Sequence, residues 1–230
     1  MTKPNANTPA ISEEMFAIIA STLEYSTRVQ SVDDSNMWRN ETTIEARPDI
    51  LDMFADDEAA WALMLANSLP GRPGVIGNAV SYMWDGGVEE FDDVWADSET
   101  EYEDLETVVS ILNSPKFVGF THHDYFSRCV ILDSIDIAPA FRGRGFGLKA
   151  AALCLFISGG NNSDTLIAAV AGGSKLDGRD KTTKNKVRNL LMSLGLPEHS
   201  ASKVPLFAAH SSHARFSATL TGIAEQTCRK

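Results

Sequence analysis

Residues 132–151 read LDSIDIAPAFRGRGFGLKAA, and this stretch decides the fold. It begins inside an apolar run, residues 128–137, whose length and composition predict a strand. A proline-containing bend follows, and three glycines then stand within five residues at the start of a helix expected over residues 145–157. Glycines let the backbone turn with its N–H groups inward, and a helix N-terminus adds unpaired N–H groups and a positive dipole end. This order of elements favours a pyrophosphate site.

Spacing separates the glycine-rich motifs that share this physics. A dinucleotide-binding fingerprint needs a third glycine where Leu148 stands, and a P-loop needs Gly-Lys-Ser/Thr where the chain has Gly147, Leu148 and Lys149. The pattern that fits is R-x-x-G-x-G, formed by Arg142, Gly145 and Gly147.

The pattern resembles the signature of the GCN5-related N-acetyltransferase superfamily. The resemblance covers residues 116–196: the strand before the motif resembles the family's fourth strand, and a strand over 165–170 and a helix over 182–194 resemble its fifth strand and fourth helix. It implies an α/β (α+β) fold. The central sheet would be mixed, mostly antiparallel, flanked by helices and splayed between its fourth and fifth strands.

The resemblance also implies acetyl-CoA as co-substrate and no metal. Strand backbone would pair with the pantetheine arm, with the N–H of Ile137 facing the thioester carbonyl, and the glycine-rich turn would hold the pyrophosphate. Arg142 and Arg144 would supply charge, and the basic run from Lys175 to Arg188 could meet the 3′-phosphate. The residues assigned to the cofactor are Ile135, Asp136, Ile137, Arg142, Gly143, Arg144, Gly145, Phe146, Gly147, Leu148 and Asn185.

The chain departs from the family pattern in the expected helix 182–194. The family's usual Asn falls on Lys184, with Asn185 adjacent, and its usual Tyr falls on Leu191. That Tyr commonly reprotonates the CoA thiolate, so here another group serves or the thiolate leaves unassisted. The departure keeps a second reading open, a CoA-binding regulatory module of the same fold that is catalytically weak or inactive.

Attack on a thioester needs a neutral amine and hence a base nearby. The expected catalytic residues are Asp133 and His122 as alternative bases and Tyr125 as an acid; Asp136 and His123 are further candidates for the base. Strict alternation would place Asp133 on the strand face of Ile135 and Ile137, with Asp136 on the other face. Two consecutive histidines point to opposite faces, so at most one can reach the site.

Charge is distributed unevenly along the chain. Residues 1–141 hold 26 acids and 7 bases, residues 142–230 hold 5 acids and 13 bases, and residues 89–106 alone hold ten carboxylates. An acid-rich surface attracts a cationic acceptor, either a small molecule or a peptide amine, although a merely solvated surface has the same composition. The basic run fits a polyphosphate ligand or nucleic acid. The net charge of −11 disfavours nucleic acid as a general partner.

Length and composition indicate an ordinary globular chain. We expect a disordered segment over 1–12 and a single acyltransferase-like domain over 13–230, in which 116–196 carries the acyl-CoA-binding core and 85–112 is an acidic insertion. Three cysteines without a C-x-x-C pair, no export signal and no membrane span predict a cytoplasmic protein. The sequence leaves a homodimer open. Further elements are expected as helices over 13–22 and 59–69 and as strands over 29–32, 75–84, 116–123, 203–208 and 216–223.

Overall fold

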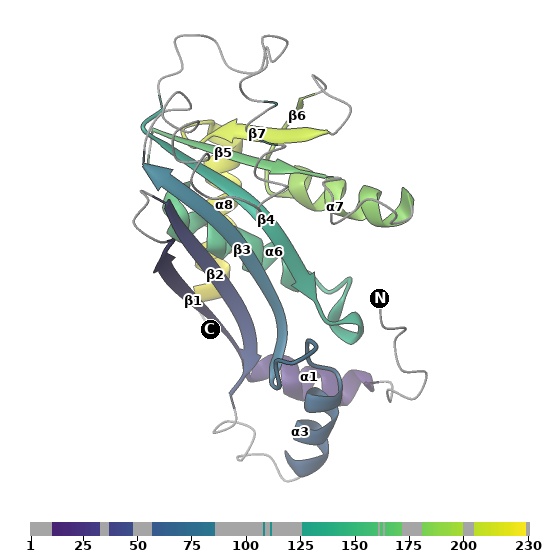
Figure 1. Cartoon of the computed structure of the whole chain (residues 1–230). Helices are drawn as coiled ribbons and strands as arrows, with labels where there is room; N and C mark the ends of the chain where they lie inside the picture. Colours follow the sequence, from purple (N-terminus) through teal and green to yellow (C-terminus); the bar gives the residue numbers. More distant parts are fainter. Residues whose placement is uncertain are drawn as a thin grey trace.

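A mixed sheet of seven strands forms the centre of the molecule in the computed structural model (Figure 1). The structure describes residues 11–32, 37–47, 57–85, 108, 111, 126–160, 162, 164–171, 181–199 and 205–228. The strands are β1 (Leu23–Ser31), β2 (Met37–Ala46), β3 (Val75–Asp85), β4 (Arg128–Ile137), β5 (Thr165–Val170), β6 (Glu198–His199) and β7 (Leu206–His210), in the spatial order β1-β2-β3-β4-β5-β7-β6. All neighbours are antiparallel except β4 and β5, which are parallel.

Helices flank this sheet, and their apolar side chains form one core against it. The helices are α1 (Glu13–Ser21), α3 (Asp57–Ala66), α6 (Phe146–Leu155), α7 (Lys181–Ser193) and α8 (Ala214–Cys228), with a 3₁₀ turn at Pro139–Phe141 and a π-helical turn at Phe156–Gly160. Each of the five contributes at least one residue to the larger core cluster, among them Ile19, Met64, Leu155, Leu191 and Phe216. Figure 1 shows α6 and α8 behind the sheet and α1 and α3 at the end where β3 begins.

We call the sheet face turned away from α6 the front face. A second cluster covers its upper half, where Val80 and Tyr82 of β3 and Cys129 and Ile131 of β4 are buried with Val108 and Ile111. Towards the start of β3 the described front face carries polar and charged side chains instead.

An extra residue in β4 changes which side chains face the helices. Ser81 pairs with Leu132 but Val80 pairs with Ser134, so Asp133 is inserted as a β-bulge. Before the bulge, Val130 and Leu132 pack into the core beside α6; after it, Ile135 and Ile137 do so. One inserted residue thus shifts the two-residue alternation by one step, as a bulge does.

The sheet splays just after the bulge. β4 pairs with β5 from Arg128 to Leu132, and among the described residues no later residue of β4 pairs with β5. β5 instead continues beside β7, with the Ala171 N–H donating to the Pro205 carbonyl at 3.2 Å. The mixed, mostly antiparallel sheet splayed between its fourth and fifth strands, expected from the sequence, is confirmed.

Several expected elements match the structure and others do not. The strands at 128–137 and 165–170 have the expected bounds, and the expected helices correspond to α1, α3, α6 and α7. The strand expected over 216–223 is wrong, because Phe216, Leu220 and Ala224 are buried along one side of helix α8. Strand β2 was not expected at all. Three expected features lie outside the described residues: the segment 1–10, the acidic residues 89–106 and the strand over 116–123. Among the described strands, β4 has β3 and β5 as its neighbours.

No helix in the described part of the chain is both long enough and apolar enough to cross a membrane.

Candidate functional site

The last residues of β4, 133–137, present backbone groups to the splay between β4 and β5. The Ala138 N–H donates to the Ile76 carbonyl in β3 at 2.8 Å. The Ile137 carbonyl lies on the other side of that trans peptide and therefore points away from β3, where it accepts from Arg142 Nε at 2.7 Å. A strand residue directs its N–H and C=O to the same edge, and this edge alternates along the strand. The N–H groups of Ile135 and Ile137 therefore face the splay, while the backbone of Asp136 faces β3.

The turn after β4 has the backbone conformation that its glycines allow. Gly143 and Gly145 have φ angles of +77° and +83°, in the left-handed region that residues with a Cβ seldom adopt. Gly145 is also the N-cap of α6 and supplies no side-chain hydrogen bond to the first turn of the helix. A Cβ added at either glycine would meet no atom within 4 Å, so the space above this turn is open. The turn therefore offers accessible N–H groups at a positive helix end.

Gly147 lets the first turn of α6 approach β4 and α7 closely. A Cβ at this position would lie 3.3 Å from Ile135 Cγ2, 3.4 Å from Ile137 Cγ1 and 3.5 Å from Leu190 Cδ1 of α7. The first turn of α6 is thus packed between β4 and α7.

The two arginines of the turn have partners within the chain. Arg144 forms two hydrogen bonds with Glu13 of α1, at 2.7 and 3.1 Å, and its guanidinium lies 3.6 Å from the ring centroid of Phe16. The Arg144 bonds lower the pKa of the Glu13 carboxyl. Sequence reasoning assigned both Arg142 and Arg144 to a phosphate. In the structure Arg142 Nε donates to the Ile137 carbonyl and Arg144 is paired with Glu13 of α1, and the role of both arginines at a phosphate stays a prediction.

Helix α7 lies beside the splay between β4 and β5, and its cationic side chains face solvent. Lys186 and Arg188 are exposed, Arg188 pairs with Glu198 at 2.5 Å, and Asn185 is exposed as well. Leu191, at the position of the family's Tyr, is buried with 2% exposure and packs into the core. No proton donor therefore replaces the Tyr at this position.

The bulge corrects the expected orientation of Asp133. Counting forward from Ile131 and back from Asp136, both Asp133 and Ser134 fall on the front face, opposite to Ile135 and Ile137. Strict alternation had placed Asp133 with the two isoleucines, and this was wrong. Asp133 is half-buried and Asp136 is exposed. His122, His123 and Tyr125 lie outside the described residues.

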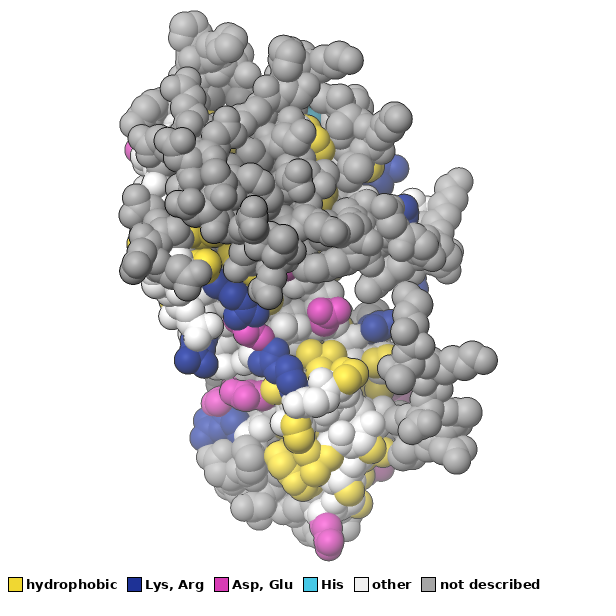
Figure 2. Space-filling view, in the orientation of Figure 1, with side chains coloured by type: hydrophobic (Ala, Val, Ile, Leu, Met, Phe, Trp, Pro, Cys, Tyr) yellow, Lys and Arg dark blue, Asp and Glu magenta, His cyan; other side chains and the backbone are white. Residues whose placement is uncertain are grey.

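A cluster of charged side chains on the front face was missed by sequence reasoning. We call it the arginine cluster: Arg39 and Glu41 of β2, Arg72 of the turn before β3, and Asn78 of β3. Glu41 accepts from Arg39 Nη1 at 2.8 Å, from Asn78 Nδ2 at 3.2 Å and from Arg72 Nη1. Burial raises the pKa of the Glu41 carboxyl, but the hydrogen bonds from the three donors outweigh this and hold the pKa below its usual value. In Figure 2, Lys/Arg and Asp/Glu side chains lie together on this face.

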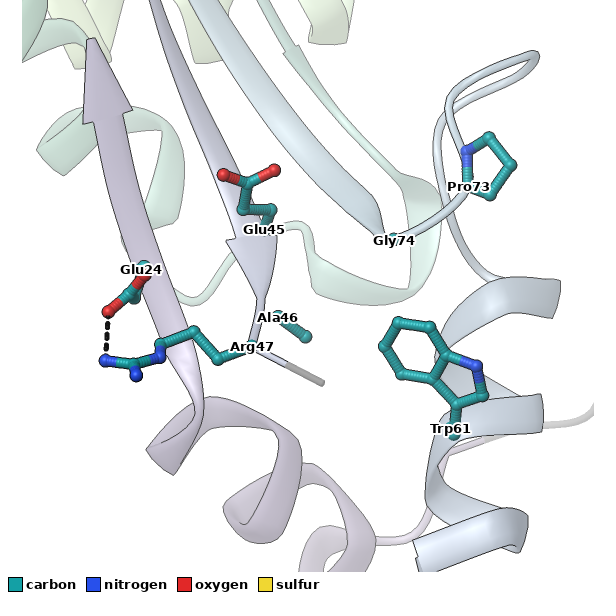
Figure 3. A pocket seen from close by; sticks show the side chains of 7 residues that line it. All are labelled: Glu24, Glu45, Ala46, Arg47, Trp61, Pro73 and Gly74. Atoms are coloured by element: carbon teal, nitrogen blue, oxygen red, sulfur yellow. Dashed lines mark hydrogen bonds and ion pairs between the residues drawn. The ribbon is translucent and has the colours of Figure 1, made fainter. Parts of the chain in front are cut away.

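A pocket of about 620 Å³ opens where β1 begins and β2 ends. Figure 3 shows Trp61 of α3 directed towards it and the ion pair of Glu24 with Arg47, at 2.6 Å, along its other side. Glu45, Ala46, Pro73 and Gly74 complete the lining. None of the residues predicted for the cofactor lines this pocket.

Within the described residues, no group of three or more His, Cys, Asp and Glu side chains is placed to hold a metal ion. Comparison of the chain with protein-family models, curated proteins and solved structures gives no significant match.

Proposed function

We propose that this chain is an acyl-CoA-dependent N-acyltransferase of the GCN5-related type, which moves an acetyl group from acetyl-CoA to a primary amine. The observation that carries the proposal is the open edge of β4. Its N–H groups at Ile135 and Ile137 face the splay, and the strand ends at a glycine turn whose helix N-terminus has no side-chain cap. An extended amide-bearing arm can pair with such an edge while a pyrophosphate occupies the turn.

In the proposed reaction the acceptor's amine nitrogen attacks the thioester carbonyl carbon. The C–N bond forms, the C–S bond breaks, the amine proton passes to a base, and the CoA thiolate takes a proton from water or an enzymic acid. The N–H of Ile137 supports the developing oxyanion, and the splay holds donor and acceptor together. Asp133 is a candidate base because the bulge turns it to the front face, from which an acceptor can approach.

The second candidate function is a CoA-binding regulatory module without turnover. The buried Leu191 favours it, because this position supplies no acid for the leaving thiolate. A CoA thiol is acidic enough to leave as a thiolate, so we place the enzyme first. The buried free thiols of Cys129 and Cys154 support the cytoplasm as its location.

Release of CoA thiol from acetyl-CoA tests both candidates. The protein is incubated with polyamines, an aminoglycoside, lysine peptides and small amino acids, and the acetylated product is identified by mass. Turnover with any amine supports the enzyme. Acetyl-CoA binding by calorimetry without turnover supports the regulatory module, and absence of binding overturns both.

A further inference from the structure

The arginine cluster carries more positive than negative charge. Arg39 and Arg72 share the single carboxylate of Glu41, and Arg28 of β1 lies directly opposite Glu41 in the strand register. Two of the seven bases of residues 1–141 thus contact one acid, in the half of the chain that holds 26 acids. This local excess is opposite in sign to the surrounding sequence, so the cluster attracts anions within an otherwise acidic half.

The cluster is level with the β4 bulge. Arg28 pairs with Glu41, Glu41 with Val80, and Val80 with Ser134, which gives one row across four strands. Adjacent strands lie about 4.8 Å apart, so two strand spacings of about 10 Å separate Glu41 from Ser134. Asn78, which donates to Glu41, lies opposite Asp136 of β4. The arginine cluster and the carboxylates of β4 therefore stand at two ends of a short stretch of the front face.

The guanidinium groups are held in place yet accessible. Their side chains are 31% exposed for Arg39 and 38% for Arg72, whereas Glu41 is 16% exposed beneath them. A guanidinium has five N–H donors, and Glu41 engages Nη1 of each arginine. Two oriented guanidinium groups suit a planar carboxylate, which accepts paired hydrogen bonds from such a fork.

We propose that the acceptor is a small amino acid, whose carboxylate binds Arg39 and Arg72 while its amine lies towards Asp133 and Asp136. Glu41 acts as a positioning residue that orients both guanidinium groups. The inference rests on the proposed acyl transfer and names its acceptor class. The acceptor still carries the cationic amine that the acid-rich half of the chain predicts, but it carries a carboxylate as well.

Matched pairs of acceptors test this inference. Glycine, β-alanine and 4-aminobutyrate are compared with their amides, which keep the amine and lose the negative charge. We expect at least one amino acid to exceed its amide in kcat/KM by about tenfold or more. Arg39→Gln and Arg72→Gln should each remove most of this preference through the KM of the acceptor, with the KM of acetyl-CoA unchanged.

The control variant is Arg47→Gln, which loses the same charge from another ion-paired arginine after β2 and should keep the preference. Arg72→Lys guards against a folding defect, because it retains the charge and should retain part of the preference. If Arg72→Gln only lowers the melting temperature and the preference persists, the arginines merely hold the 69–74 turn on the sheet and the inference is wrong.

Binding separates this inference from the proposed function. If no amine is acetylated, calorimetry compares 4-aminobutyrate with its amide. Binding of 4-aminobutyrate that is lost in Arg39→Gln and Arg72→Gln would support the anion site although the acyltransferase proposal had failed. If no amino acid is preferred to its amide in either turnover or binding, the inference is overturned even where amides are acetylated.

Discussion

At the scale of single residues, Gly145 joins a backbone requirement to a ligand requirement. Its φ of +83° disfavours any residue with a Cβ, and the free space above it is where we place the pyrophosphate. Gly145→Glu should weaken acetyl-CoA binding by more than about tenfold, because it adds a negative charge beside the phosphates. Calorimetry measures the affinity of the parent and the variant for acetyl-CoA. Gly71→Glu is the control, since Gly71 has a φ of +72° and equally open surroundings; a folded Gly145→Glu protein with parental affinity would refute the site.

We propose Asp133 as the base because the bulge places it on the front face. Asp133→Asn should lower kcat by more than about tenfold, whereas His122→Ala should lower it less. The rate should fall at low pH as base and amine protonate, with little decline at high pH because Leu191 supplies no acid. The reverse ranking would assign the base to His122. If neither substitution changes kcat, the proton passes to water and neither residue is the base. A high-pH decline that disappears in Tyr125→Phe would identify Tyr125 as the acid.

Tyr25 gives a stability prediction that does not depend on function. Its hydroxyl is buried without a hydrogen-bond partner among the described residues, and burial raises its pKa to about 12. In the unfolded chain the Tyr25 hydroxyl ionises near pH 10. The contribution of neutral Tyr25 to the stability of the folded state is therefore present below pH 10 and is lost as the pH rises towards 12. Tyr25→Phe should therefore resist alkaline unfolding better than the parent, as followed by circular dichroism. Identical alkaline transitions would show that the hydroxyl has found a partner.

At the scale of elements, Gly147 determines how closely α6 packs against β4 and α7. Gly147→Ala places a Cβ 3.3–3.5 Å from three side chains, so the usual gain in helix propensity of about 1 kcal/mol should be cancelled by crowding. Gly222→Ala in α8 meets no atom within 4 Å and should keep that gain. Urea denaturation compares the two. Equal stabilisation would mean that α6 can move away from the strands freely.

Sequence patterns predicted the elements whose burial follows a simple period. β4 and β5 are apolar enough to be bounded correctly, and the glycines located the turn. β2 was missed because its inward side includes the buried polar residues Asn40 and Thr42, which weaken the hydrophobic alternation. Local β-propensity favours a strand over 216–223, although Phe216, Leu220 and Ala224 recur four residues apart, a spacing typical of the helix that forms.

The candidate site was predictable only where it is local in sequence. The glycine turn lies within one continuous stretch, so its place between strand and helix could be predicted. The arginine cluster brings Arg72 to a carboxylate 31 residues earlier, and the register of β2 against β3 creates that contact. The face of Asp133 depends on one extra residue in a strand pair. Neither the contact of Arg72 with Glu41 nor the bulge at Asp133 follows from a periodic pattern in a single sequence.

At the scale of the whole molecule, the excess of bases over acids in residues 142–230 bears on the proposed binding of acetyl-CoA. Acetyl-CoA affinity should fall several-fold between about 20 and 200 mM salt, because charges beyond a Debye length of about 10 Å are screened. Lys186→Gln should reduce this salt dependence. Arg215→Gln, an equal charge loss on the exposed start of α8, should leave it unchanged. Affinity that ignores salt would show that long-range charge plays no part.

The bulge at Asp133 is a feature of strand length as well as of side-chain orientation. Deleting Asp133 would leave Leu132 opposite Ser81 and Ser134 opposite Val80 in an unbroken ladder, and Ile135 and Ile137 would keep their inward orientation. A chain shortened by this one residue would therefore lose a front-face carboxylate and the local bend while keeping the amide edge of β4, which separates the contribution of Asp133 from that of the edge.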